Sequence, residues 1–144
     1  MGTPIQVVID CADPAALAAF WATALGYEIQ PPPGGFDSWE DALASWGVPE
    51  DRWNDRSAVT DREGAGPRVL FQRVPEPKVV KNRVHVDVNA GGDLGTDADV
   101  RRRRVTADVA RLEAAGASVL REMEEMGEHW VVMQDPEGNE FCVQ

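Results

Sequence analysis

The side chains best suited to chemistry lie on strand-like segments in the second half of the sequence. Valines alternate with polar residues from Val84 onward, so His85 and Asp87 share one face of the predicted strand. Glu140 and Cys142, two positions apart near the other end, share a face in the same way. An imidazole next to a carboxylate can hydrogen-bond a ligand as a neutral group or bind a metal ion. These residues are therefore the first candidates for a binding site.

The first half of the sequence has a polar strand face of its own. Residues 5–11 form a near-continuous apolar strand in which Gln6 and Asp10 point the same way. A strand that served only stability would be apolar at these positions, because burying a polar group without a partner costs roughly 1–3 kcal/mol. Polar faces at matching places in both halves predict a wet, ligand-holding cleft with Gln6, His85 and Cys142 around it.

A predicted amphipathic helix follows each of these strands. Asp13 and Pro14 give N-cap and first-turn signals for a helix that runs to about residue 25, where Gly26 ends it. In the second half, Thr96 is the predicted cap of a helix over residues 97–115. The residues expected to face the sheet are Leu17 and Phe20 in the first helix and Val109 and Leu112 in the second.

The chain repeats one plan twice. A strand, a helix and three further strands are predicted for residues 4–75 and again for residues 79–144, with a proline-rich boundary between them. A short helix over residues 38–47 is an insertion in the first half. A lone module of this size buries too little apolar surface to be stable. The two modules are therefore expected to form a single domain over residues 1–144.

Two motifs resemble the glyoxalase-like fold of the vicinal oxygen chelate superfamily, which includes glyoxalases, bleomycin resistance proteins and dioxygenases. Residues 135–139, DPEGN, resemble the D-P-x-G-N turn before the last strand of that fold. The run from Asp13 through Phe20-Trp21 to Gly26-Tyr27 resembles its first-helix signature. The resemblance implies an α+β fold in which two βαβββ modules form an incomplete eight-stranded barrel with helices outside. It also implies that two chains pair as a homodimer.

The resemblance further indicates where members of the superfamily place metal ligands. Those positions fall here on Gln6, on His85, on Cys142, and on either Phe71 or Gln72, of which Gln72 is favoured because Phe71 suits the helix layer better. No carboxylate is among them, although hard cations prefer carboxylate oxygens, and two neutral amides are poor ligands for zinc. We therefore expect no metal cofactor. A divalent metal ion held by His85 is the alternative.

Tryptophans are the candidates for apolar walls of the cleft, because ligand sites combine many apolar lining groups with a few polar ones. Two of them lie on the inserted helix, which either fills a small core of its own or covers a pocket. No catalytic residue is assigned. The predicted ligand-binding residues are Gln6, Gln72, His85, Asp87, Cys142, Trp21, Trp39, Trp46 and Trp130.

The overall composition excludes some partners. The chain has 144 residues and a formal net charge of −11, which opposes nonspecific binding to nucleic acid or to an anionic membrane. No apolar run approaches the roughly 20 residues of a membrane span, and no basic signal segment precedes the first strand, so we expect a cytoplasmic protein. Cys11 and Cys142 are expected to be buried thiols, with a disulfide between them as the alternative.

Three functions are compatible with these features. The first is an enzyme that acts on a small organic substrate in the barrel cleft without an intact metal triad. The second is a non-enzymatic binder that sequesters a toxic compound or antibiotic. The third is a divalent-metal lyase or dioxygenase of the superfamily. The metal content of the purified protein separates the third from the others, and turnover of a bound ligand separates the first from the second.

Overall fold

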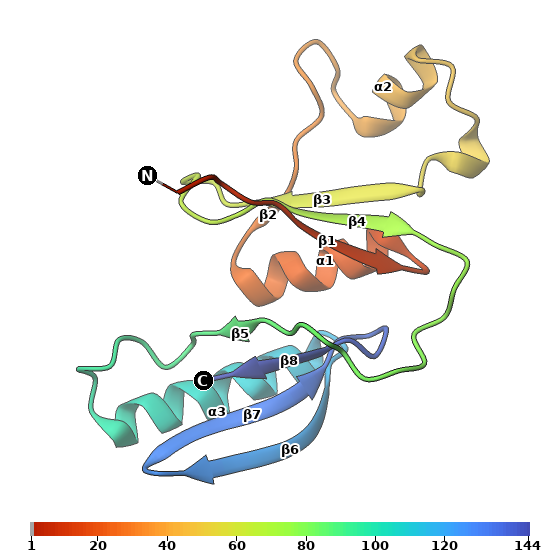
Figure 1. Cartoon of the computed structure of the whole chain (residues 1–144). Helices are drawn as coiled ribbons and strands as arrows, with labels where there is room; N and C mark the ends of the chain where they lie inside the picture. Colours follow the sequence, from red (N-terminus) through yellow and green to blue (C-terminus); the bar gives the residue numbers. More distant parts are fainter. Residues whose placement is uncertain (1) are drawn as a thin grey trace. The chain divides into compact units, whose positions relative to one another are not determined.

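A computed structural model describes residues 2–144 of the chain. The chain divides into two compact units, one ending at Pro77 and the other beginning at Lys78. The predicted modules, 4–75 and 79–144, fall within these units. Each unit has a four-stranded sheet, and in each the element order after the first strand is a helix and then three strands (Figure 1).

The first unit contains four strands and three helical segments. Its sheet has the order β1-β4-β3-β2, in which β1 and β4 are parallel and the other neighbours are antiparallel. The elements are β1 (Val7–Cys11), α1 (Pro14–Leu25), β2 (Glu28–Ile29), α2 (Trp39–Ser45), η1 (Glu50–Arg52), β3 (Arg56–Thr60) and β4 (Val69–Arg73).

Helix α1 forms where the sequence predicts it and covers one face of this sheet (Figure 1). The Asp13 side chain accepts a hydrogen bond from the Ala16 amide, and Gly26 ends the helix with a φ of 67°. Phe20 and Leu17 are 3% and 1% exposed, so the predicted buried stripe is confirmed. This stripe and the sheet residues beneath it form the core of the first unit.

The segment between β2 and β3 lies on the other side of the sheet from α1 (Figure 1). Ser38 caps α2 by accepting a hydrogen bond from the Asp41 amide. The sequence predicts plain loop for residues 49–55, whereas the structure has the 3-10 helix η1 there. We call residues 38–55, with α2 and η1, the insert.

The second unit has the same strand arrangement in its sheet, with the order β5-β8-β7-β6 and β5 parallel to β8. Helix α3 packs on β6, β7 and β8, and its residues Val105 and Leu112 are buried. Val109, which the sequence predicts to face the sheet with Leu112, is only half-buried. The elements are β5 (Asp87–Val88), α3 (Ala98–Ala114), β6 (Ser118–Glu125), β7 (Glu128–Gln134) and β8 (Glu140–Val143). The α+β fold of two βαβββ modules is therefore confirmed, with the eight strands in two separate sheets.

Three boundaries in the second unit differ from the prediction. The strand predicted over residues 83–89 is regular only at Asp87 and Val88, because its partner β8 has four residues and pairing with it begins at the Val86 carbonyl. The sequence predicts an acidic connection over residues 122–128. In the structure most of these residues belong to strands, and the chain reverses direction at Met126-Gly127. Asp97 caps α3 in place of Thr96, because its carboxylate accepts hydrogen bonds from two first-turn amides.

Equivalent acidic turns precede the last strand of each unit. Asp61 accepts hydrogen bonds from the amides of Glu63, Ala65 and Gly66, and these bonds lower the pKa of its carboxyl. Asp135 is 3% exposed and accepts hydrogen bonds from the amides of residues 137 and 139. The sequence predicts both turns from an aspartate followed by a glycine.

Two further expectations concern the whole chain. Cys11 and Cys142 are both buried thiols, as predicted. Over residues 2–144, no helix combines the length and the apolar character needed to cross a membrane. The cytoplasmic location stays a prediction.

Candidate functional site

A cavity of about 1060 Å³ lies on the face of the first sheet opposite α1. Strands β3 and β4 form its floor, and the insert covers it. Ala58 pairs with Leu70 and Arg56 pairs with Gln72, so these four side chains lie on one face of the sheet. Each of the four lines the cavity.

Strand alternation decides which β4 side chain faces the cavity. Phe71 is fully buried and does not line the cavity, whereas Gln72 does. Its side-chain amide donates a hydrogen bond of 2.8 Å to the Asp10 carboxylate on β1. Of the two alternatives from the sequence, the structure therefore places Gln72 at the site and Phe71 in the core.

Two tryptophans of the insert form the apolar part of the cavity's cover. The Trp39 indole donates a 2.7 Å hydrogen bond to the Gln30 carbonyl, and the Trp53 indole donates a 2.9 Å bond to the Val48 carbonyl. Both rings line the cavity. Because their N–H groups are satisfied by backbone carbonyls, the rings offer apolar surface to a ligand.

The end of the insert is tied to the start of α1. Asn54 accepts a 2.8 Å hydrogen bond from the Ala15 amide and donates a 2.8 Å bond to the Asp13 carboxylate. The bond from Asn54, with that from the Ala16 amide, lowers the pKa of Asp13. The cover of the cavity is thus held to the helix on the opposite side of the sheet.

A polar network occupies the other end of the cavity floor. Arg68 donates a 2.6 Å hydrogen bond from Nε to the Gln30 side-chain oxygen and a 2.7 Å bond from Nη1 to the Gln6 side-chain oxygen. Arg68 and Gln30 line the cavity. Gln6 reaches the site through its bond to Arg68 and is not itself a lining residue.

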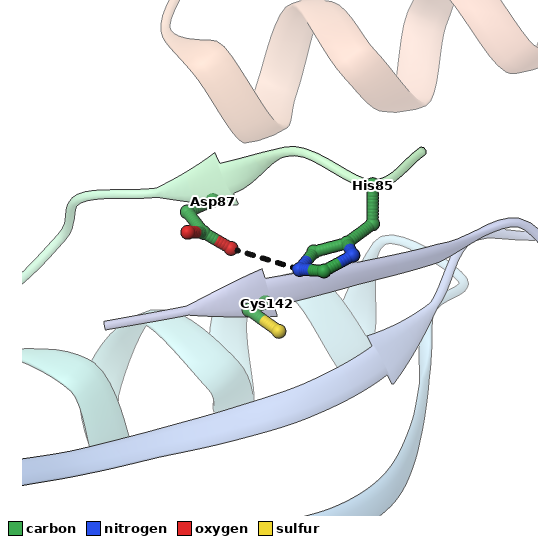
Figure 2. A group of neighbouring side chains, drawn as sticks. All are labelled: His85, Asp87 and Cys142. Atoms are coloured by element: carbon green, nitrogen blue, oxygen red, sulfur yellow. Dashed lines mark ion pairs between the residues drawn. The ribbon is translucent and has the colours of Figure 1, made fainter. Parts of the chain in front are cut away.

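In the second unit, His85, Asp87 and Cys142 come together on one face of the sheet (Figure 2). Asp87 and Cys142 are register partners on β5 and β8, so their side chains are neighbours. His85 Nε2 lies 3.5 Å from Asp87 Oδ1. Burial raises the pKa of the Cys142 thiol, and the nearby Asp87 carboxylate raises it further. The thiol is therefore held in its protonated form at neutral pH.

These three side chains supply the donor types of a zinc site with three protein ligands. Their ligand atoms lie within 4.8 Å of one another. A tetrahedral zinc ion with bonds of about 2.0–2.3 Å holds its ligands about 3.3–3.8 Å apart. The donor chemistry fits a metal ion, but binding would require the group to contract and the thiol to lose its proton.

The remaining predicted site residues, Trp21, Trp46 and Trp130, neither line the cavity nor belong to the group of His85, Asp87 and Cys142. Trp21 is 3% exposed and packs edge-to-face on Phe20 in the core, where α1 covers the sheet. Trp46 is 55% exposed and contacts the Trp39 ring at a centroid distance of 6.5 Å. Trp130 is half-buried on β7, two residues from Val132, which is the register partner of Cys142.

The other histidine has a structural partner. His129 Nε2 lies 2.7 Å from the Glu122 carboxylate. It is one residue from Trp130 on β7, so its side chain lies on the sheet face opposite Cys142. His129 is therefore not placed to activate the Cys142 thiol.

Among the cavity-lining residues that sequence reasoning missed are Trp53, Arg56 and Arg68. Trp53 falls in a stretch that reads as plain loop. The two arginines lie on predicted strands in which polar and apolar residues alternate. Their positive charge in a strongly acidic chain was the signal that could have identified them. Arg68 and Arg56 share their strand face with Gln72, Leu70 and Ala58, so that face carries charged, polar and apolar side chains together.

The chain belongs to the glyoxalase-like domain family, because the profile of that family matches residues 6–144. This assignment agrees with the two-module architecture and with the closing turn at residues 135–139. A search of curated proteins gave no match to the sequence.

Solved structures with the same fold come from several bacteria. A glyoxalase/bleomycin resistance protein/dioxygenase family enzyme from Burkholderia phytofirmans PsJN is 17% identical, with a TM-score of 0.58 over 96% of this chain and 94% of that one. FosX from Listeria monocytogenes, a fosfomycin resistance protein solved with Mn(II) and 1S,2S-dihydroxypropylphosphonic acid, is 11% identical, with a TM-score of 0.61 over 100% and 90%. TioX from Micromonospora sp. ML1 is 16% identical, with a TM-score of 0.55 over 99% and 97%. At these identities the likeness shows the fold alone.

Proposed function

We propose that this protein binds a small organic molecule in the cavity of the first unit and acts on it without a metal ion. The observation that carries the proposal is the cavity itself, about 1060 Å³ in volume with an apolar cover and a polar floor. Its size is just above the range of about 300–1,000 Å³ for small-molecule sites. A fosfomycin resistance protein of this fold was solved with a small phosphonic acid, which supports a role in binding small molecules.

Native mass spectrometry of the protein as isolated tests the proposal first, since a retained small molecule would add mass to the folded chain. Calorimetric titration with naphthalene-2-carboxamide tests it on a defined probe. We expect binding that is lost in Leu70→Trp, which fills the cavity floor, and kept in Leu120→Trp, which changes a half-exposed residue of β6. Equal binding by both variants would contradict the proposal.

The same cavity would also serve a binder that sequesters a toxic compound or antibiotic. Aromatic and amide side chains, which can hold a ligand without chemistry, are among the residues that line the cavity. Recovery of the bound molecule after prolonged incubation separates the two functions. An unchanged molecule indicates sequestration, and a converted one indicates catalysis.

The second candidate function is that of a divalent-metal lyase or dioxygenase, and the group of His85, Asp87 and Cys142 favours it. These residues would hold the ion, which would act as a Lewis acid on a substrate oxygen when bound. His85 and Asp87 are both about half-exposed, so a substrate could approach the group. Close to one equivalent of metal in the purified protein, lost in His85→Ala, would favour this function over the first.

We further propose that two chains assemble as a homodimer. Val79, Val80 and Val84 are each at least 71% exposed, and apolar side chains are frequently covered by a partner when they cluster in this way. Light scattering at micromolar concentrations tests the proposal. A mass of one chain across that range would refute it.

A further inference from the structure

Arg68 differs from Arg52, Arg62 and Arg73 of the first unit in the partners that it has. Arg52, Arg62 and Arg73 each lie within 4 Å of a carboxylate. Arg68 donates hydrogen bonds to two side-chain amide oxygens, which carry no charge. Its positive charge is therefore held in place by neutral groups, with no carboxylate in contact among residues 2–144.

The two amide bonds also fix the orientation of the guanidinium group. Nε and Nη1 are occupied, and Nη2 has no acceptor among the described residues. The residue is half-buried in the cavity wall, with Leu70 next on the same strand face. An arginine that is already oriented loses little conformational entropy when it binds an oxyanion.

The cavity lining as a whole carries a net positive charge, as Arg68 itself does. Four arginines (Arg52, Arg56, Arg68 and Arg73) and two carboxylates (Glu40 and Asp55) line it, which leaves two positive charges in excess. Asp55 is already paired with Arg52 and Arg73. On a chain with a net charge of −11, this positive excess is a local feature of the cavity. A cleft with a net positive charge attracts anionic ligands.

The apolar part of the cavity indicates the chemistry of the rest of the ligand. Trp39, Trp53 and Leu70 line it, and each indole N–H is already bonded to a backbone carbonyl. A ligand that fits both parts carries an oxyanion at one end and a flat apolar body at the other. A neutral polar ligand would leave the charge of Arg68 uncompensated inside the cavity, which is unfavourable.

From these observations we infer that Arg68 is the anion-binding residue of the cavity and that the ligand is an aromatic or similarly apolar carboxylate. This inference rests on the proposed function, because it names the ligand class of the same cavity. The Arg68 guanidinium donates from Nη2 to the carboxylate, while Gln6 and Gln30 hold it in position. Arg56, which is exposed and has no ion pair among the described residues, adds a weaker attraction at the far end of the floor.

Titration calorimetry with two probes of equal shape tests the inference. Naphthalene-2-carboxylate and naphthalene-2-carboxamide differ in charge and not in ring size. We expect the carboxylate to bind at least about tenfold more tightly to the unaltered protein, as a hydrogen bond to a charged group requires. Added salt should weaken carboxylate binding and leave carboxamide binding unchanged.

Variants show which side chain causes the preference for the carboxylate. In Arg68→Gln the preference for the carboxylate should disappear, and Arg68→Lys should keep part of the preference because it keeps the charge. Arg56→Gln should reduce the preference less than Arg68→Gln does. Arg103→Gln, an exposed arginine on α3 in the second unit, is the matched control and should bind both probes as the unaltered protein does. Thermal melting of each variant confirms that it is folded.

The outcomes separate this inference from the proposed function. If the carboxamide binds and the carboxylate binds no more tightly, the anion inference is overturned and the proposed function stands. If the preference persists in folded Arg68→Gln, or falls more in Arg56→Gln, Arg68 is not the anion-binding residue. If neither probe binds, both the inference and the proposed function are overturned.

Discussion

The two units share one architecture and differ in what stands over the open face of the sheet. In the first unit, residues 30–55 connect β2 to β3 and include α2 and η1. At the equivalent place in the second unit, residues 126–127 form a tight turn between β6 and β7. The long connection gives the first sheet a covered cavity, whereas the second sheet keeps a long hairpin and the group of His85, Asp87 and Cys142.

This difference shows where variation enters a duplicated module. The strands and helices of each unit build a core of their own, with Leu17 and Phe71 in the first and Leu112 and Phe141 in the second. The connections can change without disturbing these cores, because they lie outside the packed layers. A ligand site can therefore arise in one unit while the other retains the plain module.

The largest expected effect tests whether the two cores are equivalent. Leu17→Ala and Leu112→Ala remove the same atoms from positions that are 1% and 0% exposed. We expect each to lower the free energy of unfolding by about 2–5 kcal/mol, the usual cost of such a cavity. Denaturant titration measures both changes. A loss below about 1 kcal/mol for one of them would show that its helix face is not the buried one.

The next effect concerns the two acidic turns. Asp135→Ala leaves the amides of residues 137 and 139 without their acceptor in a buried turn, so we expect a loss of about 1–3 kcal/mol. Asp61→Ala should cost less, because water can replace the carboxylate at that more exposed turn. The comparison uses the same denaturant titration. An equal loss of unfolding free energy in the two variants, or a larger loss in Asp61→Ala, would contradict the claim that burial makes the Asp135 turn the more important one.

The sequence was sufficient to predict most of the fold and less of the site. Periodicity and capping predicted α1 well, because Asp13, Pro14 and Gly26 are strong local signals. The strand predicted over residues 83–89 is regular only at Asp87 and Val88, because strand pairing depends on the length of β8 and not on local propensity. Arg68 and Trp53 were missed because the cavity exists only when the insert folds over β3 and β4.

A smaller effect tests the tie between the insert and α1. Asn54→Ala removes both hydrogen bonds of that side chain, and we expect a loss of about 1 kcal/mol at neutral pH with faster proteolysis within the insert. Asn54 lowers the pKa of Asp13. The stability that this hydrogen bond contributes is present above the ordinary aspartate pKa of about 3.9. It is lost as the pH falls through the lowered pKa of Asp13. Melting temperatures of the two proteins should therefore converge in acid. A difference that grows in acid would refute the assignment.

The smallest expected effect is in metal content. Because the ligand atoms of His85, Asp87 and Cys142 spread to 4.8 Å and the thiol holds its proton, protein purified without added ions should contain well below one equivalent of metal. Elemental analysis of the unaltered protein and of Cys142→Ser measures this. About one equivalent in the former and none in the latter would show that the second unit holds a metal ion.

The most direct test of the central claim is an NMR titration of ¹⁵N-labelled protein with naphthalene-2-carboxamide. The account predicts that the indole N–H signals of Trp39 and Trp53 and the amides of β3 and β4 shift with increasing probe and saturate together, because these groups surround the cavity. Leu70→Trp should abolish the shifts. Saturating shifts confined to residues of the second unit, or none at millimolar probe, would contradict the claim that the covered cavity of the first unit binds a small organic molecule.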